Sequence, residues 1–386
     1  MTEHLKVDLR EEFVHGLEDV IVCKSKVSDV NGEKGILTYR GYDVYDLAEH
    51  ATFEEVSYLL LFGELPTQKQ LDDFKAKLVA YRRVPASVIK ILKDCPLDAH
   101  PMTVLRTGIS ALGCTDLYAD DTSLVNETEI SYKLISQMST VTAAIARIRS
   151  GKEPVSQDPS LSHAANFLFT MTGKRPDKPT ERIMDMALVA HADHELPAST
   201  FSALVVNSSM TDLYSSITAA IGSLKGPLHG GANEVALHNV IKIGSPQNVK
   251  AYMDDVVANK KKVPGIGHRV YKTHDPRAVL LKKYAKELAY ANNMKQMFDT
   301  AEELEKRCVE VFSKKGLYPN VDFYSGIVYH ILDIDIEIFT PIFAVARISG
   351  WCARVLEYLP TNRIFRPRAL YEGHSDRKYV KIEGRS

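Results

Sequence analysis

Residues 52–66 read TFEEVSYLLLFGELP, which is the pattern of a capped amphipathic helix. Thr52 can cap the first turn, and the two glutamates after it favour a helix start because negative charge is stabilised there. Apolar residues then recur at spacings of three and four until Gly63, with Pro66 beyond it, marks the end. The stretch therefore predicts an α-helix with one buried face.

The same spacing recurs along most of the chain, so an all-α fold is expected. Strands are predicted only near the N-terminus, at residues 20–28 and 35–39, where β-branched residues flank a turn signal at 29–32. Besides residues 53–61, helices are expected over residues 71–81, 88–92, 132–148, 183–193, 212–224, 249–259, 278–291 and 300–312.

Composition narrows the class of protein. The 386 residues exceed the usual size of a single core, so two domains or one large domain with an insertion are expected, and the 45% hydrophobic content is ample for a core. A net charge of −1 gives no electrostatic footprint for nucleic acid or an anionic membrane. The five cysteines form no CxxC pair, and neither a secretory signal nor a run of about 18 apolar residues is present. A cytoplasmic protein with no membrane and no nucleic-acid partner is expected.

Four stretches carry the candidate chemistry. They supply histidines and a carboxylate as acid and base, without an obvious metal or redox motif, as an enzyme that makes and captures a carbanion requires. The stretches are HADHELPAST (191–200), GPLHGGAN (226–233), PGIGHRVYKTHDPR (264–277) and YPNVDFYSG (318–326).

The GPLHGGAN stretch predicts a turn that presents His229. Gly226, Gly230 and Gly231 let the backbone approach a ligand and are the strongest hinge candidates in the chain. His229 would then be placed to donate a hydrogen bond to a substrate carbonyl. A tight helix crossing with a passive histidine is the alternative, whereas the missing GK[ST] ending argues against a phosphate loop.

The HADHE stretch places His191 and His194 three residues apart, on one face of an expected helix that Pro197 interrupts. Three interpretations stay open here: direct substrate binding, helix packing and a zinc site. The HExxH order is missing and no cysteine is near, which weakens the zinc interpretation.

The PGIGH stretch predicts a glycine-rich loop that presents His268. It is not a dinucleotide loop, because Val270 stands where the third glycine would be. Lysines at 260–262 and Lys272 suit a polyphosphate ligand, although a solvated lysine face is the alternative. Asp275 and the proline after it signal the start of a helix.

Three arginines and one aspartate complete the set of candidates. Arg277, Arg347 and Arg366 could each grip a carboxylate through two parallel hydrogen bonds, or could form surface ion pairs. Asp322 lies at an expected turn, where it is either a helix cap or a general base.

In order and spacing, including the nine residues from His268 to Arg277, these stretches resemble the citrate synthase family, from about Gly16 to the chain end. The resemblance implies an all-α homodimer. It also implies a large domain at residues 1–230 and 336–386, and an inserted small domain at 231–335 that closes over oxaloacetate and creates the acyl-CoA site.

The resemblance assigns a role to each candidate. Asp322 would remove a proton from the acetyl methyl group while neutral His229 donates to the thioester oxygen. His268 would polarise the oxaloacetate ketone and protonate the forming alkoxide. Oxaloacetate and citrate would be bound by His194, His229, His268, Arg277, Arg347 and, from the other subunit, Arg366.

Coenzyme A would be bound by residues of the small domain: Val263, Pro264, Gly265, Ile266, Gly267, Lys272 and Lys315. The thioester is a substrate, so the resemblance implies no cofactor and no metal. The short N-terminal region is similar to the dimeric form of the family rather than to the hexameric form that NADH inhibits.

The implied reaction condenses acetyl-CoA, oxaloacetate and water to citrate and CoA, at the entry of the tricarboxylic acid cycle. The alternative is 2-methylcitrate synthase, which uses propionyl-CoA. RGYDVYDLAEH (40–50) is at least as similar to that type, whereas PIFAVARISGW (341–351) is more similar to short citrate synthases. A metal-dependent hydrolase and a non-catalytic helical scaffold are the interpretations from other classes.

Overall fold

The computed structural model describes residues 13–385 and is mostly helical, which confirms the all-α prediction. Residues 25–363 form one compact unit that contains every α-helix and strand of the described chain. The described parts of the two chain ends, residues 13–24 and 364–385, form the other unit and contain only short 3-10 helices. The candidate chemistry of all four stretches therefore lies in the first unit.

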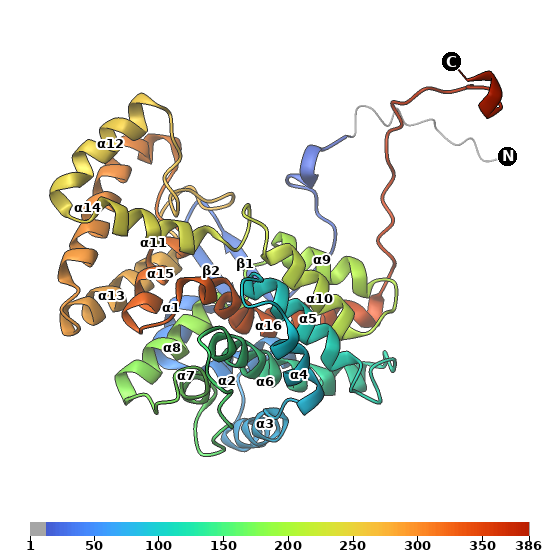
Figure 1. Ribbon diagram of the computed structural model, residues 1–386, viewed down its shortest axis with the longest axis horizontal. Coiled ribbons are helices and arrows are strands. Elements are labelled where there is room, and N and C mark those ends of the chain that lie inside the picture. The colour runs from blue at the N-terminus through green and yellow to red at the C-terminus, as the bar shows by residue number, and fades with distance from the viewer. Residues whose placement is uncertain (1–12, 386) are drawn as a thin grey trace. The chain divides into compact units, whose positions relative to one another are not determined.

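Sixteen α-helices make up most of this unit (Figure 1). They are α1 (Val44–His50), α2 (Phe53–Phe62), α3 (Gln68–Tyr81), α4 (Ala86–Asp94), α5 (Pro101–Gly113), α6 (Leu124–Arg149), α7 (His163–Thr172), α8 (Lys178–His191), α9 (Ala198–Asn207), α10 (Leu213–Leu224), α11 (Ala232–Ile243), α12 (Val249–Ala258), α13 (Pro276–Ala291), α14 (Lys295–Phe312), α15 (Val321–Ile331) and α16 (Phe339–Tyr358).

Helix α2 forms as its sequence predicts. The Thr52 hydroxyl accepts a hydrogen bond from the Glu55 N–H, and the Glu55 carboxylate accepts one from the Thr52 N–H, so two unpaired donors of the first turn are satisfied. Gly63 ends the helix with a φ of 95°, a left-handed conformation that glycine adopts without steric cost.

The sheet differs from the prediction. Strands β1 (Ser28–Asn31), β2 (Ile36–Tyr39) and β3 (Tyr42–Asp43) form an antiparallel sheet in which Ser28 faces Tyr39. The predicted strand at 20–28 is wrong, because the turn falls at 32–35, where Gly35 has a φ of 64°. Asp29 and Asn31 suggested a turn, but their backbones pair with β2.

Helix α16 is the central helix of the core. It packs against α2, α6, α8, α9 and α10, and nearly all of its side chains are buried. Among the described residues, the stretch at 336–361 has the length and hydropathy of a membrane span, and 89% of its most apolar window is buried against the rest of the protein. This is the environment of a core helix.

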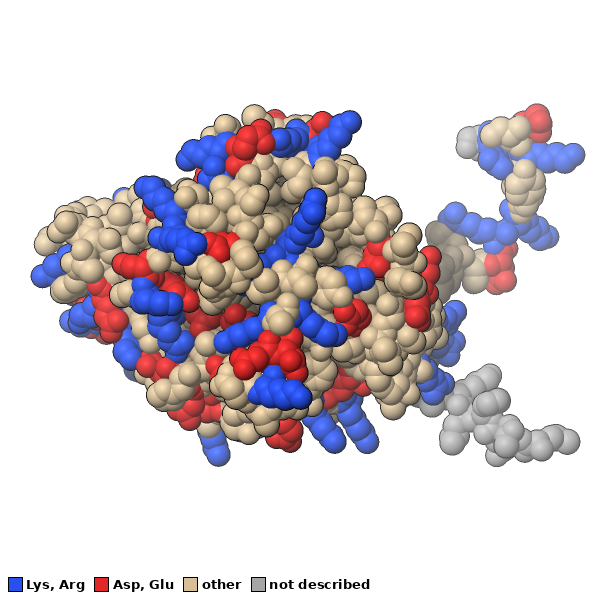
Figure 2. All heavy atoms as spheres, turned by 90° about the horizontal axis from the view of Figure 1, so that it is seen from below, with Lys and Arg blue, Asp and Glu red and all other residues tan. Residues whose placement is uncertain are grey.

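Helices α11 to α15 pack mainly on one another and lie together in Figure 1, in yellow and orange. They fall within the predicted small domain, whose borders at 231 and 335 stay a prediction. Figure 2 shows lysine and arginine side chains interspersed with aspartate and glutamate on one face of the protein.

Candidate active site

His194 lies on the turn at residues 192–197, which joins α8 to α9. Its side chain is buried, and its Nε2 is 3.1 Å from the hydroxyl of Tyr271. Burial, followed by the charge of Arg277, holds the pKa of His194 well below its usual range. His194 is therefore a neutral hydrogen-bonding group.

The expectation that His191 and His194 share a helix face is wrong, because α8 ends at His191. The His191 ring is fully buried, and its Nδ1 lies 2.8 Å from the Ala187 carbonyl oxygen, so the helix-packing interpretation applies to it. In the part of the chain that the structure describes, no three side chains are grouped as a metal site requires.

His229 lies on the turn between α10 and α11, and its contacts define which ring nitrogen carries the proton. The Ser199 backbone N–H donates to His229 Nε2 at 3.3 Å, and the Ser199 hydroxyl lies 2.8 Å from the same nitrogen. Trp351 Nε1 donates to that hydroxyl oxygen at 3.3 Å, which leaves the hydroxyl hydrogen available to His229. Nε2 is thus the acceptor, and Nδ1–H remains the donor.

Two further features support a neutral His229. Burial, together with the Arg347 charge, lowers the pKa of His229 to about 4. The Ser199 N–H belongs to the first turn of α9, where backbone donors lack partners within the helix. The helix start therefore fixes the tautomer of the histidine.

His268 has the opposite tautomer. Its Nδ1 accepts from the backbone N–H groups of Val270 at 3.0 Å and Tyr271 at 3.2 Å, which leaves Nε2–H as the donor. Burial, followed by Arg277, lowers the pKa of His268 to about 4. The His194 and His268 ring centroids are 5.1 Å apart, so the structure brings these two predicted residues together.

Arg277 is the second residue of α13 and is almost fully buried. Its Nε and Nη2 donate to the two carboxylate oxygens of Asp275, at 3.0 and 2.7 Å. Asp275 also accepts from the Val321 N–H at the start of α15, at 3.2 Å. Arg277 is thereby connected to the helix that carries Asp322.

Arg347 is 1% exposed, at the centre of α16. Its Nε donates to the His191 carbonyl oxygen at 2.7 Å, and its guanidinium carbon lies 4.7 Å from the Phe343 ring centre. Nη2 has no hydrogen-bond partner among the described residues, and burial lowers the pKa of Arg347 to about 10. A buried cation with an open donor is suited to bind an anion.

Asp322 is the second residue of α15, and the helix cap is Asn320, whose side chain accepts the Asp322 N–H at 3.0 Å. The capping interpretation of Asp322 is therefore wrong. The Asp322 side chain is buried, and its Oδ1 has no hydrogen-bond partner in the described structure. Burial raises its pKa to about 7, although Arg277 and Arg347 oppose the shift. This is the value of a carboxylate base near neutral pH.

The glycine-rich loop is bound to the segment that leads into α15. Gly267 N–H donates to the Tyr318 carbonyl at 2.7 Å, and Asn320 N–H donates to the Gly265 carbonyl at 2.9 Å. A side-chain carbon on Gly265 would lie 3.0 Å from Phe323, so this close approach needs glycine. The loop and the Asp322 helix therefore form one wall.

The other predicted coenzyme A residues lie on the same wall. Val263 and Gly265 are buried, Pro264, Ile266 and Gly267 are half-buried, and both lysines are exposed. A side-chain carbon on Gly316 would lie 3.5 Å from Lys272 Cβ, so Lys315 and Lys272 come from adjoining backbone segments. Arg366 is exposed and belongs to the unit of the chain ends, so its predicted role stays untested.

Sequence reasoning missed three residues of this region. Tyr271 contacts His194, Asp275 pairs with Arg277, and Phe343 lies against Arg347. Asp275 was interpreted only as a helix start, yet it both caps α13 and binds the arginine two residues later. A buried acid beside the buried Arg277 could have been expected from the HDPR sequence.

The chain is similar to known proteins over nearly its whole length. The family model described as "Citrate synthase, C-terminal domain" matches residues 16–368. Citrate synthase of Deinococcus radiodurans is 46% identical over 96% of this chain and 98% of its own. 2-Methylcitrate synthase 2 of Corynebacterium glutamicum is more distant, at 38% identity over 96% of this chain and 97% of its own.

Solved structures agree with the sequences. Citrate synthase from Pyrobaculum aerophilum has a TM-score of 0.91 at 43% identity, covering 97% of this chain and 95% of that one. The ternary complex of citrate synthase from Thermoplasma acidophilum with carboxymethyl coenzyme A and oxaloacetate also has a TM-score of 0.91, at 36% identity, covering 96% and 99%. The chain therefore belongs to the citrate synthase family of transferase-type condensing enzymes.

Proposed function

We propose that the protein condenses acetyl-CoA with oxaloacetate and water to give citrate and CoA. The observation that carries the proposal is that the chain has both a buried carboxylate, Asp322, and two neutral histidines whose donor nitrogens are set by backbone contacts. Such a site can remove a proton from a weak carbon acid and stabilise the oxygen that takes up the charge.

In the first step, Asp322 removes a proton from the methyl group of acetyl-CoA. The electron pair moves toward the thioester oxygen, where His229 Nδ1–H donates a hydrogen bond. A donor aimed in advance at such an oxygen contributes about 3–4 kcal/mol to the transition state. A neutral imidazole suffices because the Ser199 contacts keep its proton on the required nitrogen.

In the second step, the enolic carbon attacks the ketone carbon of oxaloacetate. A carbon–carbon bond forms, the carbonyl π bond breaks, and the alkoxide takes the proton of His268 Nε2–H, which the proton taken up by Asp322 then replaces. His194 holds the same substrate through hydrogen bonding. Water then attacks the thioester carbon of citryl-CoA and the carbon–sulfur bond breaks. One proton of the water goes to the thiolate and the other to solvent, and citrate and CoA leave.

Oxaloacetate is a dianion, and the open Nη2 of Arg347 is suited to one of its carboxylates. We assign Arg277 to the other carboxylate and Arg366 to the site of a partner subunit in a homodimer. The loop at 263–267 would bind the adenine of CoA, and Lys272 and Lys315 would bind its phosphates. Closure of residues 231–335 over the site would keep citryl-CoA from premature loss.

The proposal needs neither a metal nor a cofactor beyond the thioester substrate, and we place the enzyme in the cytoplasm.

The reaction is tested by thiol release from acetyl-CoA or propionyl-CoA in the presence of oxaloacetate. A higher kcat/KM for acetyl-CoA is expected, as relatives named citrate synthase are more similar than those named 2-methylcitrate synthase. A higher value for propionyl-CoA would establish the alternative, and no release with either would refute both.

The shared site is tested separately, in mixed dimers. Asp322→Ala and Arg366→Ala chains should each be nearly inactive alone, because each lacks one group that every site needs. Mixed dimers should recover activity, since one of the two sites then has both groups intact. Absence of recovery in verified mixed dimers would place Arg366 outside the partner's site.

A further inference from the structure

Helix α16 holds the three consecutive residues that precede His194, from the last residue of α8 into the turn. Arg347 Nε donates to the His191 carbonyl at 2.7 Å, and the Gly350 N–H donates to the Ala192 carbonyl at 3.1 Å. Arg354 then pairs with Asp193. Because of their spacing, residues 347, 350 and 354 lie on one face of α16. This face therefore contacts the chain from His191 to Asp193, immediately before His194.

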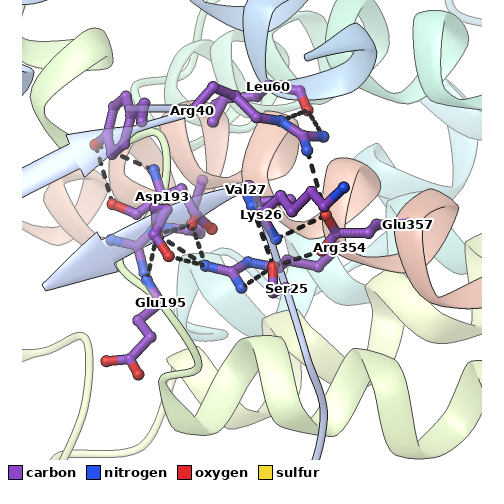
Figure 3. A network of polar contacts seen from close by, with 12 residues as sticks. Ser25, Lys26, Val27, Arg40, Leu60, Asp193, Glu195, Arg354 and Glu357 are labelled. Atoms are coloured by element: carbon purple, nitrogen blue, oxygen red, sulfur yellow. Dashed lines mark hydrogen bonds and ion pairs between the residues drawn. The ribbon is translucent and has the colours of Figure 1, made fainter. Parts of the chain in front are cut away.

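The last of these contacts is a buried ion pair. Arg354 Nη2 lies 2.9 Å from Asp193 Oδ2, and the two side chains are 3% and 0% exposed (Figure 3). The Ser28 hydroxyl donates to the same carboxylate oxygen at 2.6 Å and accepts from Arg354 at 2.8 Å. Arg354 Nη1 also donates to the Ser25 hydroxyl. A buried pair with this many hydrogen bonds has a defined geometry.

The hairpin at the N-terminus holds the turn from the other side. The Tyr39 hydroxyl lies 3.0 Å from the Asp193 carbonyl, to which it donates, and it accepts the Asp193 N–H at 3.2 Å. The Ser28 hydroxyl accepts the N–H of Glu195 at 2.8 Å. The backbone is thus fixed immediately before and immediately after His194.

The turn needs such support. Glu195 has a φ of 59°, a conformation that costs a non-glycine residue about 1 kcal/mol or more and persists only when its surroundings enforce it. Gly350 leaves no spare room, because a side-chain carbon there would lie 2.4 Å from both the Ala192 carbonyl oxygen and Asp193 Oδ1. The turn is therefore in direct contact with the helix backbone.

We propose that Arg354, Asp193 and Ser28 are positioning residues that fix His194 in its oxaloacetate-binding orientation. This inference rests on the proposed function, because it concerns the same site. None of the three is assigned to touch the substrate. They act through the backbone of residues 193–195, so their loss should change oxaloacetate binding before it changes the chemistry of proton removal.

The test uses the full chain and measures the oxaloacetate dissociation constant by calorimetry. The kcat and the KM for acetyl-CoA are measured on the same variants. Arg354→Met should weaken oxaloacetate binding about tenfold, since a displacement near 1 Å in a positioned group can have effects up to about 100-fold. The acetyl-CoA KM at saturating oxaloacetate should change less than about twofold. Arg354→Lys retains the charge and should recover most of the lost affinity.

Arg82→Met is the matched control. Arg82 is also 3% exposed, and it donates to the carbonyls of Asp158 and Leu161, both at 2.8 Å, away from the His194 turn. It should lower Tm without changing oxaloacetate affinity. If Arg354→Met does not fold, Ser28→Ala is the second variant, and it should bind oxaloacetate about three- to tenfold more weakly than the wild type. The control for Ser28→Ala is Ser136→Ala, which loses one buried hydrogen bond to the Leu78 carbonyl.

The outcomes separate the two proposals. A wild-type chain that neither binds oxaloacetate nor releases CoA would refute the proposed function and this inference together. Wild-type turnover combined with unchanged oxaloacetate affinity in folded Arg354→Met or folded Ser28→Ala would overturn this inference alone. An equal loss of affinity in Arg82→Met would also overturn it, because the effect would then follow stability rather than position.

Discussion

Helix α16 carries two buried arginines two turns apart, and their surroundings differ. Arg354 is paired with Asp193 at 2.9 Å, so the cluster around it is neutral. Arg347 donates to a carbonyl oxygen and has no carboxylate within ion-pair distance among the described residues. The aspartates differ in the same way, because Asp193 belongs to the ion pair with Arg354, whereas Asp322 forms no ion pair in the described structure and burial raises its pKa to about 7.

The comparison shows how one core supplies both rigidity and reactivity. A paired charge fixes geometry because moving either partner leaves the other buried and uncompensated. An unpaired charge is unfavourable in the free protein, and a substrate with the opposite charge or a transferable proton relieves the penalty. Arg354 and Asp193 thus suit a supporting role, whereas Arg347 and Asp322 suit contact with substrate.

The largest effect is expected for Asp322→Asn, which preserves shape and removes the base. We expect kcat to fall by about 100- to 10,000-fold, the usual contribution of general base catalysis. Thiol release under saturating substrates measures it. A variant that retains more than a tenth of wild-type kcat would contradict the assignment of the base and the contrast with Asp193.

Arg347→Met should have the next largest effect. Removing a buried guanidinium that binds a carboxylate removes a charge-assisted hydrogen bond of about 1.5–3 kcal/mol, or about 10- to 100-fold in the KM for oxaloacetate. Tm should change little, because Arg347 has no ion-pair partner among the described residues and the variant loses one hydrogen bond, to the His191 carbonyl. A marked fall in Tm would show that Arg347 is structural, as Arg354 is.

The sequence points to candidate residues more directly than to their surroundings. The four stretches supplied His194, His229, His268, Arg277 and Asp322, whose roles stay predictions, because glycines, prolines and short polar motifs mark unusual backbone in the sequence itself; the structure brings the rings of His194 and His268 together. The strand at 20–28 was misplaced because Asp29 and Asn31 favour turns locally, whereas pairing with β2 decides their conformation.

Tautomers and pairing could not be predicted in the same way. The proton positions of His229 and His268 depend on backbone N–H groups of Ser199, Val270 and Tyr271. Arg354 and Asp193 are 161 residues apart. Such contacts follow from packing in three dimensions, so neither composition nor local spacing reveals them.

As pH rises, ionisation of Asp322 should raise the activity of the enzyme and lower the stability of its folded state. The base must be ionised, so kcat/KM should fall about tenfold per pH unit below a pKa of about 7. A pKa raised from its ordinary value near 4 means that the folded state holds the proton more tightly than the unfolded state. Stability is therefore lost as pH rises from about 4 to about 7.

Asp322→Asn cannot ionise, so its Tm should exceed that of the wild type by a few degrees at pH 8 and match it near pH 4. Thermal denaturation at both pH values measures this difference. Asp193→Asn is the control, because removing a paired charge leaves Arg354 buried alone and should lower Tm at pH 8. Equal effects in the two variants would remove the distinction between paired and unpaired carboxylates.

The smallest effect is expected for Ser199→Ala. The hydroxyl is one of two groups that hold His229 Nε2 as an acceptor, and the Ser199 backbone N–H at 3.3 Å remains in the variant. Because the tautomer survives, kcat should fall only about three- to tenfold, the effect of one hydrogen bond of roughly 1 kcal/mol. Nitrogen NMR should still find the proton on Nδ1. A shift of the proton to Nε2 would show that the side chain, rather than the start of α9, controls this half of the site.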